Sequence, residues 1–201
     1  EGKDELTDED KKQLAQIEDN FHKAINDDLN MPLAMSYVWE LAKFEKKNII
    51  DVGTGAGFPG IPLAIMLPQT NFVLIDSLDK RITFLKTVLE ELGLSNVTLY
   101  HGRAEDFGKD TLFREQFDYC VSRAVAPLPI LLEYCSPFIK VDGSLLLYKS
   151  IKTDQEVDES KHALDELNCK ISEICTLSDD EDYKRYIIEI HKINETPTKY
   201  P

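Results

Sequence analysis

Short apolar runs alternate with amphipathic segments along most of the chain. Residues 48–52 (NIIDV) are almost wholly apolar and end in a glycine-rich loop, which is typical of a strand buried on both faces of a parallel sheet. Further strands are predicted at residues 72–76, 97–100, 117–121, 144–148, 170–177 and 185–191. Helical periodicity predicts helices at residues 61–67, 80–92, 128–139 and 155–167. The alternation indicates an open, mainly parallel α/β sheet of about seven strands, and we expect the last strand to be antiparallel.

The first part of the chain has a different pattern. A capping-type pattern at residues 7–10 and a second helix start at residues 30–32 predict two helices ahead of the sheet. The hydrophobic period changes near residue 47. We therefore expect an N-terminal helical segment over residues 1–47 and an α/β domain over residues 48–201.

Composition excludes several classes of protein. The 201 residues are 42% hydrophobic, which suffices for a core, and no apolar run approaches the roughly 18 residues of a membrane helix. No secretory signal pattern opens the chain, and the four cysteines lack C-x-x-C spacing, so we expect a cytoplasmic protein with reduced thiols and no metal site. The 23 basic and 37 acidic residues give a net charge of −14. Any nucleic-acid role therefore needs a local basic patch.

A glycine-rich loop carries the strongest chemical signal. Residues 51–60 (DVGTGAGFPG) follow a predicted strand and open a predicted helix, the place where α/β sheets bind nucleotide-like ligands. Gly53, Gly55 and Gly57 let the backbone turn sharply and approach a ligand closely. Asp76 closes the next strand, where its carboxylate is placed to accept hydrogen bonds from ribose hydroxyls.

Three interpretations of this loop compete. A nicotinamide-dinucleotide site needs a G-x-G-x-x-G pattern, but Phe58 stands where the third glycine belongs and would obstruct helix–strand packing. A tight turn without any ligand is the second interpretation. A G-x-G-x-G loop with an acid ending the second strand fits a class I S-adenosylmethionine (SAM) methyltransferase better than a dinucleotide site.

Several ordered motifs resemble one family. They are residues 51–60, 76–85, 101–108 and 122–126, together with Lys140 and the closing residues 196–201. From about residue 48 to residue 201 the chain resembles the RsmG (GidB) family, methyltransferases that modify a guanine N7 of 16S rRNA. The resemblance implies SAM as cofactor and 16S rRNA in the small ribosomal subunit as partner. It places at the cofactor Gly53, Gly55, Gly57, Phe58, Asp76, Ser77, Ala104, Glu105 and Arg123.

Within that set, the resemblance assigns distinct parts. Asp76 and Ser77 would take the ribose edge, Ala104 and Glu105 the adenine end, and Arg123 a catalytic position beside the cofactor and target base. Simpler roles stay open: a solvated loop at Glu105 and a structural ion pair at Arg123. Three other side chains each have two possible roles. Tyr148 and Phe58 would either stack on the target base or belong to the core, and Lys149 would either contact RNA phosphate or be solvated. Positive charge for RNA would come from Lys80, Arg81, Arg103, Arg123 and Lys149.

The expected chemistry needs few catalytic groups. Guanine N7 has a free lone pair and loses no proton on methylation, so no general base is required. The protein must hold N7 in line with the methyl group at roughly 3–3.5 Å and exclude water. Two other functions remain as alternatives, a SAM-binding module or recombinant scaffold without turnover and a small-molecule methyltransferase.

The ends of the chain depart from the family pattern. Residues 21–44 resemble the helical domain of cysteinyl-tRNA synthetases, although the nucleotide-binding signatures of those enzymes are absent. The chain also ends where the RsmG family usually continues with basic residues. We therefore expect a chimera in which SAM binding survives better than rRNA methylation.

Overall fold

The computed structural model describes residues 47–150, 153–178 and 185–201. The chain divides into two compact units, residues 1–45 and 46–201, and the described residues belong to the second unit. The helices predicted ahead of residue 47, which include the synthetase-like segment, lie outside the described residues.

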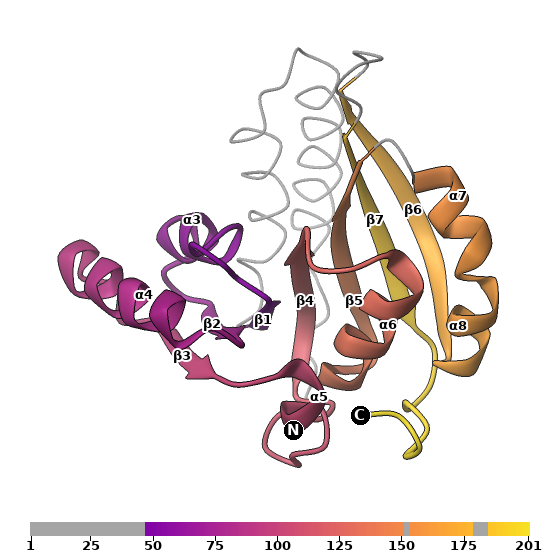
Figure 1. Ribbon diagram of the computed structural model, residues 1–201, viewed down its shortest axis with the longest axis horizontal. Coiled ribbons are helices and arrows are strands. Elements are labelled where there is room, and N and C mark those ends of the chain that lie inside the picture. Colours follow the sequence, from indigo (N-terminus) through magenta and orange to yellow (C-terminus); the bar gives the residue numbers. More distant parts are fainter. Residues whose placement is uncertain (1–46, 151–152, 179–184) are drawn as a thin grey trace, which may run out of the picture. The chain divides into compact units, whose positions relative to one another are not determined.

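Seven strands and their connecting helices follow the predicted alternation (Figure 1). The strands are β1 (Asn48–Val52), β2 (Asn71–Asp76), β3 (Val97–His101), β4 (Phe117–Arg123), β5 (Ile139–Lys149), β6 (Cys169–Ser178) and β7 (Arg185–Lys192). The helices are α3 (Gly60–Met66), α4 (Asp79–Leu92), α5 (Ala104–Phe107), α6 (Leu128–Cys135), α7 (Thr153–Glu159) and α8 (Lys161–Glu166), with a 3-10 turn at Ser136–Phe138.

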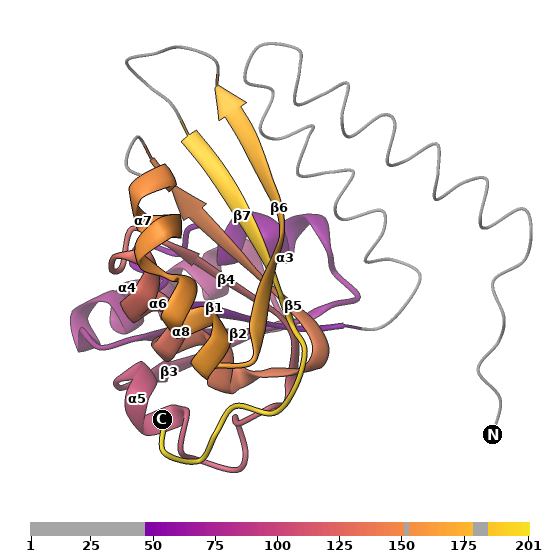
Figure 2. The same cartoon turned by 90° about the vertical axis from the view of Figure 1, so that its right-hand side faces the viewer.

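The seven strands form one sheet in the order β3-β2-β1-β4-β5-β7-β6. Strands β1 to β5 pair in parallel, while β7 runs antiparallel to both β5 and β6 (Figure 2). The predicted mixed sheet with an antiparallel last strand is thereby confirmed. The chain moves outward from β1 to β3 and then returns to the other side of β1 at β4. A parallel sheet with this reversal opens a crevice beyond the carboxyl ends of β1 and β4.

Side chains of β1 alternate between the two faces of the sheet. Ile50 and Val52 join the main core with Leu128 and Leu131 of α6, on the face that α6 and α8 cover. Asp51 points to the opposite face, where it meets the first residue of α3. Helices α3 and α4 lie on that second face (Figure 1), so each face of the sheet is covered by helices and β1 is buried on both.

The helix boundaries differ from the prediction in three places. The helix predicted over residues 128–139 ends at Cys135, because the chain turns through a 3-10 helix containing Pro137 before β5 begins at Ile139. The helix predicted over residues 155–167 is two helices separated at Ser160, whose hydroxyl donates to the Glu156 carbonyl at 2.6 Å. The four-residue helix α5 was not predicted, because four residues carry no periodic signal.

One side-chain amide closes the carboxyl end of α3 against the sheet. Asn96 Nδ2 donates to the carbonyl oxygens of Ala64, Leu67 and Thr70 at 3.0, 3.0 and 3.1 Å. These carbonyls have no partner inside the helix because they lie at or beyond its last turn. Asn96 thereby holds the segment between α3 and β2 beside the start of β3.

We expect Asn96→Asp to lower the free energy of unfolding by about 2–4 kcal/mol, because a carboxylate would face three carbonyl oxygens that it cannot satisfy. Urea denaturation at pH 7 measures this loss. The matched control is Asn71→Asp, which changes an exposed amide bonded to Asn48 and should cost less than about 1 kcal/mol. Equal losses in the two variants would contradict the role given to Asn96.

Candidate functional site

A buried carboxylate supports the turn between β1 and α3. Asp51 Oδ2 accepts hydrogen bonds from the Thr54 hydroxyl at 2.7 Å and from the Gly60 N–H at 2.9 Å. A Cβ at Gly60 would lie 2.7 Å from that same oxygen and 2.9 Å from Leu74. Gly60 therefore permits the close helix–strand contact that the third glycine provides in dinucleotide sites. Sequence reasoning missed this role, although Gly60 closes the glycine-rich motif.

The same turn is also fixed to the end of β2. Backbone N–H groups of Gly53 and Thr54 donate to the Ile75 carbonyl at 3.0 and 3.1 Å, and the Gly55 N–H donates to Asp76 Oδ2 at 2.9 Å. Gly53 and Gly55 have φ angles of +70° and +64°, a conformation that side chains disfavour. The glycines thus let three consecutive residues bind the neighbouring strand.

Asp76 already has several hydrogen-bond donors. Besides Gly55, its carboxylate accepts from the Leu78 N–H at 2.9 Å and from Arg81 Nη1 at 3.1 and 3.4 Å. A carboxylate offers about four acceptor positions, so these donors nearly fill it. Arg81 is half exposed and makes the longest contacts, which makes it the partner that a ligand hydroxyl would most easily replace.

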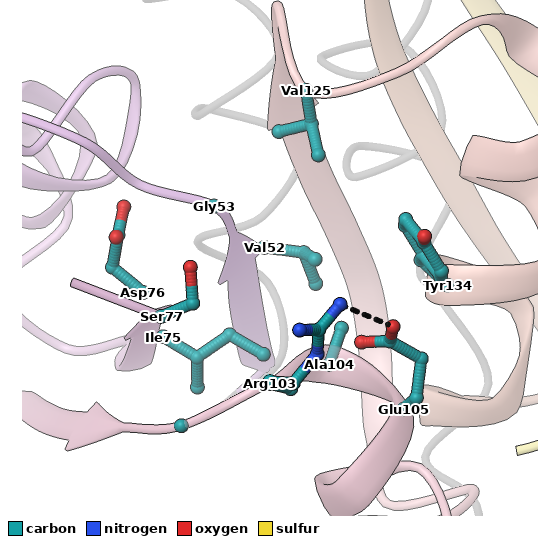
Figure 3. A pocket seen from close by; sticks show the side chains of 11 residues that line it. Val52, Gly53, Ile75, Asp76, Ser77, Arg103, Ala104, Glu105, Val125 and Tyr134 are labelled. Carbon is teal, nitrogen blue, oxygen red and sulfur yellow. Dashed lines mark hydrogen bonds and ion pairs between the residues drawn. The ribbon is translucent and has the colours of Figure 1, made fainter.

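A cavity of about 170 Å³ opens at this carboxyl edge (Figure 3). Val52 and Ile75 give it apolar surface, with Asp76 and Ser77 on one side and Tyr134 on the other. The ends of β1 and β2, the start of α5, the segment after β4 and helix α6 all contribute. The full lining is Val52, Gly53, Ile75, Asp76, Ser77, Gly102, Arg103, Ala104, Glu105, Val125 and Tyr134.

The structure brings together five of the nine residues that the sequence placed at the cofactor: Gly53, Asp76, Ser77, Ala104 and Glu105. Gly55, Gly57, Phe58 and Arg123 are not among the lining residues. Sequence reasoning missed the lining residues Val52, Ile75, Gly102, Val125 and Tyr134, and it named Arg103 only as a cation for RNA. All but Tyr134 lie next to, or within two residues of, a residue that was predicted. Tyr134 reaches the cavity from α6 and gave no signal of its own.

Gly57 serves packing between helices. A Cβ there would lie 2.5 Å from Ile61 and 2.9 Å from Leu85, so only a glycine lets α3 and α4 meet at this point. The next residue, Phe58, is 50% exposed, and the Arg123 guanidinium lies 5.5 Å from its ring centroid. The exposed pair is a cation–π contact at the end of β4.

Lys149 has neither of its two predicted roles. Its side chain is only 7% exposed, and its ammonium lies 2.6 Å from Glu156 Oε2 and donates to the Ala126 carbonyl at 2.8 Å. Glu156 in turn accepts the Leu128 N–H at 2.7 Å. Lys149 is therefore a structural cation that ties β5 to α7 and to the start of α6, and neither reaches for phosphate nor is solvated.

Two other predicted side chains also have partners. Arg103 Nη2 lies 3.2 Å from Glu105 Oε1, and this ion pair stands at the mouth of the cavity (Figure 3). His101, the first residue of the matched motif at residues 101–108, places Nε2 at 3.2 Å from the Ser77 carbonyl. Within residues 47–150, 153–178 and 185–201, no group of three His, Cys, Asp or Glu side chains is arranged to hold a metal. No helix in these ranges is long and apolar enough to cross a membrane.

Comparison with protein families decides where the chain belongs. The family model described as "GidB: rRNA small subunit methyltransferase G" matches residues 33–188. This chain is a member of the GidB family. The match starts at residue 33, so it includes part of the segment that resembles a synthetase helical domain.

Curated relatives agree with the GidB assignment. Ribosomal RNA small subunit methyltransferase G of Thermoanaerobacter sp. (strain X514) is 51% identical over 158 residues, which cover 78% of this chain and 66% of the relative. The protein of the same name from Clostridium beijerinckii is 48% identical and covers 77% and 65%. The chain thus spans just under two thirds of the length of these relatives.

Solved structures share the fold of this GidB chain at low identity. A mutant of the 16S rRNA (adenine(1408)-N(1))-methyltransferase from Catenulisporales acidiphilia superposes with a TM-score of 0.64 at 14% identity, covering 81% of this chain and 93% of that one. M. jannaschii TYW2 in complex with AdoMet gives a TM-score of 0.60 at 15% identity, covering 74% and 70%. The fold is that of class I SAM-dependent methyltransferases.

Burial changes the acidity of Asp51. The side chain is fully buried, and loss of solvation raises the pKa of its carboxyl to about 6, against the hydrogen bonds from Thr54 and Gly60 and the charge of Arg123, which lower it. Among the described residues, Asp51 Oδ1 has no hydrogen-bond partner. The pKa is higher in the folded state than in the unfolded state, so the folded protein holds a proton that the unfolded chain releases between about pH 4 and pH 6.

We therefore expect the free energy of unfolding to fall by about 3 kcal/mol from this group as pH rises from 4 to 7. Asp51→Asn removes the titrating group. Urea denaturation across this range, in wild type and variant, isolates the effect as the difference between the two stabilities. That difference should decrease with rising pH through the window, and parallel pH profiles would show that Asp51 titrates normally.

Proposed function

We propose that this chain binds SAM in the cavity at the carboxyl edge and transfers its methyl group to guanine N7 of 16S rRNA in the small ribosomal subunit. Membership of the GidB family supports the reaction, and the names of its relatives support the substrate. The observation that carries the proposal is that Gly53, Asp76 with Ser77, and Ala104 with Glu105 come from three strand ends and line one cavity.

The lining residues fit the parts of SAM. A Cβ at Gly53 would lie 2.5 Å from the Val125 side chain, so the glycine lets the segment after β4 approach the turn closely, and we expect the methionine portion to lie along the bare Gly53 backbone. Val52 and Ile75 offer apolar surface to adenine, with the start of α5 at its edge. Ser77 and Asp76 would bind the ribose hydroxyls, which requires Arg81 to give up its contacts with Asp76.

The residues of the chain act by holding and orienting the two reactants. SAM supplies a methyl group already activated by its sulfonium. Methylation at guanine N7 releases no proton from the base, so neither of the lining carboxylates, Asp76 and Glu105, has to act as a general base. Arg123 over Phe58 presents a flat, cationic surface at the end of β4, suited to holding an unstacked base. We propose that Arg123 orients the guanine in this way.

The RNA partner has to be bound by few cations. With a net charge of −14 and Lys149 committed to Glu156, positive charge at the carboxyl edge would come from Lys80, Arg81, Arg103 and Arg123. A small number of phosphate contacts gives a shallow dependence of affinity on salt. Residues 1–47, the proposed separate helical segment, would add any further contacts. We place the protein in the cytoplasm, with the ribosomal subunit it would modify.

Methyl transfer is tested on small ribosomal subunits that lack this modification. With labelled SAM, we expect label in 16S rRNA that digestion and mass spectrometry identify as 7-methylguanosine. Arg123→Ala should slow transfer by about 100-fold, because the base loses its orientation. Tight SAM binding without any methylation of the subunits would favour the alternative, a binding module without turnover, and label on small molecules alone would favour a small-molecule methyltransferase.

Two glycine variants test the position of the cofactor. Gly53→Ala and Gly55→Ala impose the same backbone strain, since both residues have positive φ angles. They differ in space, because a Cβ at Gly53 meets Val125 whereas one at Gly55 has nothing nearer than 4.0 Å. Titration calorimetry should show at least about tenfold weaker SAM binding for Gly53→Ala, a loss of about 1.4 kcal/mol, and near wild-type affinity for Gly55→Ala. Equal affinities would contradict this placement.

A further inference from the structure

One wall of the cavity is built on an element that cannot hold its own shape. Helix α5 has four residues, no side-chain cap at its first turn and no buried residue. Isolated helices shorter than about 12 residues are marginal in water. Nevertheless, four consecutive residues at the start of this helix line the cavity. They are Gly102 and Arg103, just before α5, and Ala104 and Glu105, in its first turn. The geometry of this wall must come from what α5 packs against.

An aromatic cluster holds the inner side of α5. The Phe107 ring lies 4.8 Å from Phe113 and 5.9 Å from Tyr100 between centroids. A Cβ at Gly102 would lie 2.8 Å from the Phe107 ring, so the last residue of α5 packs directly on the segment that opens the cavity wall. This contact fixes one side of the helix and leaves its carboxyl end to other partners.

The last residues of the chain hold the carboxyl end of α5. In both views the C-terminus lies beside α5 (Figures 1 and 2). Arg114 Nη1 donates to the carbonyl oxygens of Gly108 at 2.9 Å and Tyr200 at 3.3 Å. Its Nη2 donates to those of Thr196 at 2.8 Å and Pro197 at 3.4 Å. One guanidinium therefore joins the residue that ends α5 to three points of the C-terminal segment.

The contact at Gly108 is close enough to exclude a side chain. A Cβ there would lie 2.9 Å from the carbonyl carbon of Pro201 and 3.2 Å from its oxygen. Gly108 has a φ angle of −62°, which any residue adopts. The glycine is thus required by the approach of the C-terminal segment and not by the backbone conformation.

The C-terminal segment is itself fixed to the core. Glu115 Oε1 accepts the Thr196 N–H at 2.9 Å and the Lys192 ammonium at 2.7 Å. Lys192 is fully buried and also donates to two carbonyls beside the 3-10 turn, those of Ser136 and Ile139. Farther along, Glu166 of α8 accepts hydrogen bonds from Lys199 and from the Tyr200 hydroxyl. Both ends of the segment are therefore held before it reaches α5.

We propose that residues 196–201, the C-terminal strap, position α5 and so set the cavity wall at the adenine end, with Arg114 as the positioning residue that connects them. Arg114 is not among the lining residues and would act on the ligand only through Gly108 and α5. The inference rests on the proposed SAM-binding function. It predicts that loosening the strap weakens cofactor binding without altering any lining side chain.

The test compares SAM affinity and melting temperature across variants of the whole chain. Arg114→Gln removes the guanidinium and most of its hydrogen bonds to the strap and Gly108, and we expect the Kd for SAM to rise about tenfold. Arg114→Lys keeps a cation that reaches some of the carbonyls and should recover part of the affinity. Gly108→Ala should also raise the Kd severalfold, although glycine-to-alanine changes at an unstrained φ usually stabilise a protein. Hydrogen exchange at residues 102–108 should quicken in Arg114→Gln and Gly108→Ala.

Phe72→Leu is the control for general loss of stability. Phe72 is buried in β2, at the opposite end of that strand from Asp76, so this variant should lower the melting temperature and leave the Kd within about twofold of wild type. If it raises the Kd as much as Arg114→Gln does, the effect is general and the strap proposal is overturned.

The remaining outcomes separate the two proposals. Wild-type protein that does not bind SAM would refute the proposed function itself. Wild-type binding with unchanged affinity in Arg114→Gln and Gly108→Ala would refute only the strap. If Arg114→Gln fails to fold, Gly108→Ala decides the question, because its single added methyl group acts at the contact between the strap and α5.

Discussion

Two carboxylates from neighbouring strands fix the backbone turn on which the proposed site depends. Asp51 holds the turn from within β1 through Thr54 and Gly60, and Asp76 holds it from the end of β2 through Gly55. Both side chains are buried, so their hydrogen bonds to backbone N–H groups are protected from water. Without these bonds, three residues at positive φ would have no reason to keep one conformation.

The rest of the cavity is less firmly built, and this difference has a functional meaning. The β2 side stands on strand ends and carboxylates, whereas the opposite wall stands on α5, which needs the aromatic cluster and the C-terminal strap for its position. Because the α5 wall depends on contacts outside the cavity, those contacts can change the affinity of the site for its ligand. The energetic link is physical and local, from Arg114 through Gly108 to the lining residues.

Much of this architecture follows from the sequence, because hydrophobic runs and ordered motifs are local signals. The seven strands, the mixed direction of the sheet and the cavity position at the carboxyl edge agree with the pattern of residues 48–201, whereas the strand order comes from the structure alone. What sequence reasoning missed depends on tertiary contacts. From the sequence alone Lys149 is a cation without a partner, because its ion pair with Glu156 depends on the folding of α7 against β5. Tyr134 belongs to no motif, so nothing in the sequence places it beside the cavity. Helix α5 is likewise too short, at four residues, to show helical periodicity in the sequence.

A crystal structure with bound S-adenosylhomocysteine tests the central claim most directly. We predict the adenine between Ile75 and the start of α5, the ribose at Asp76 and Ser77 with Arg81 moved aside, and the amino-acid portion along the backbone of Gly53. A ligand bound elsewhere on the sheet, or a cavity closed by Val125 at saturating ligand, would contradict it.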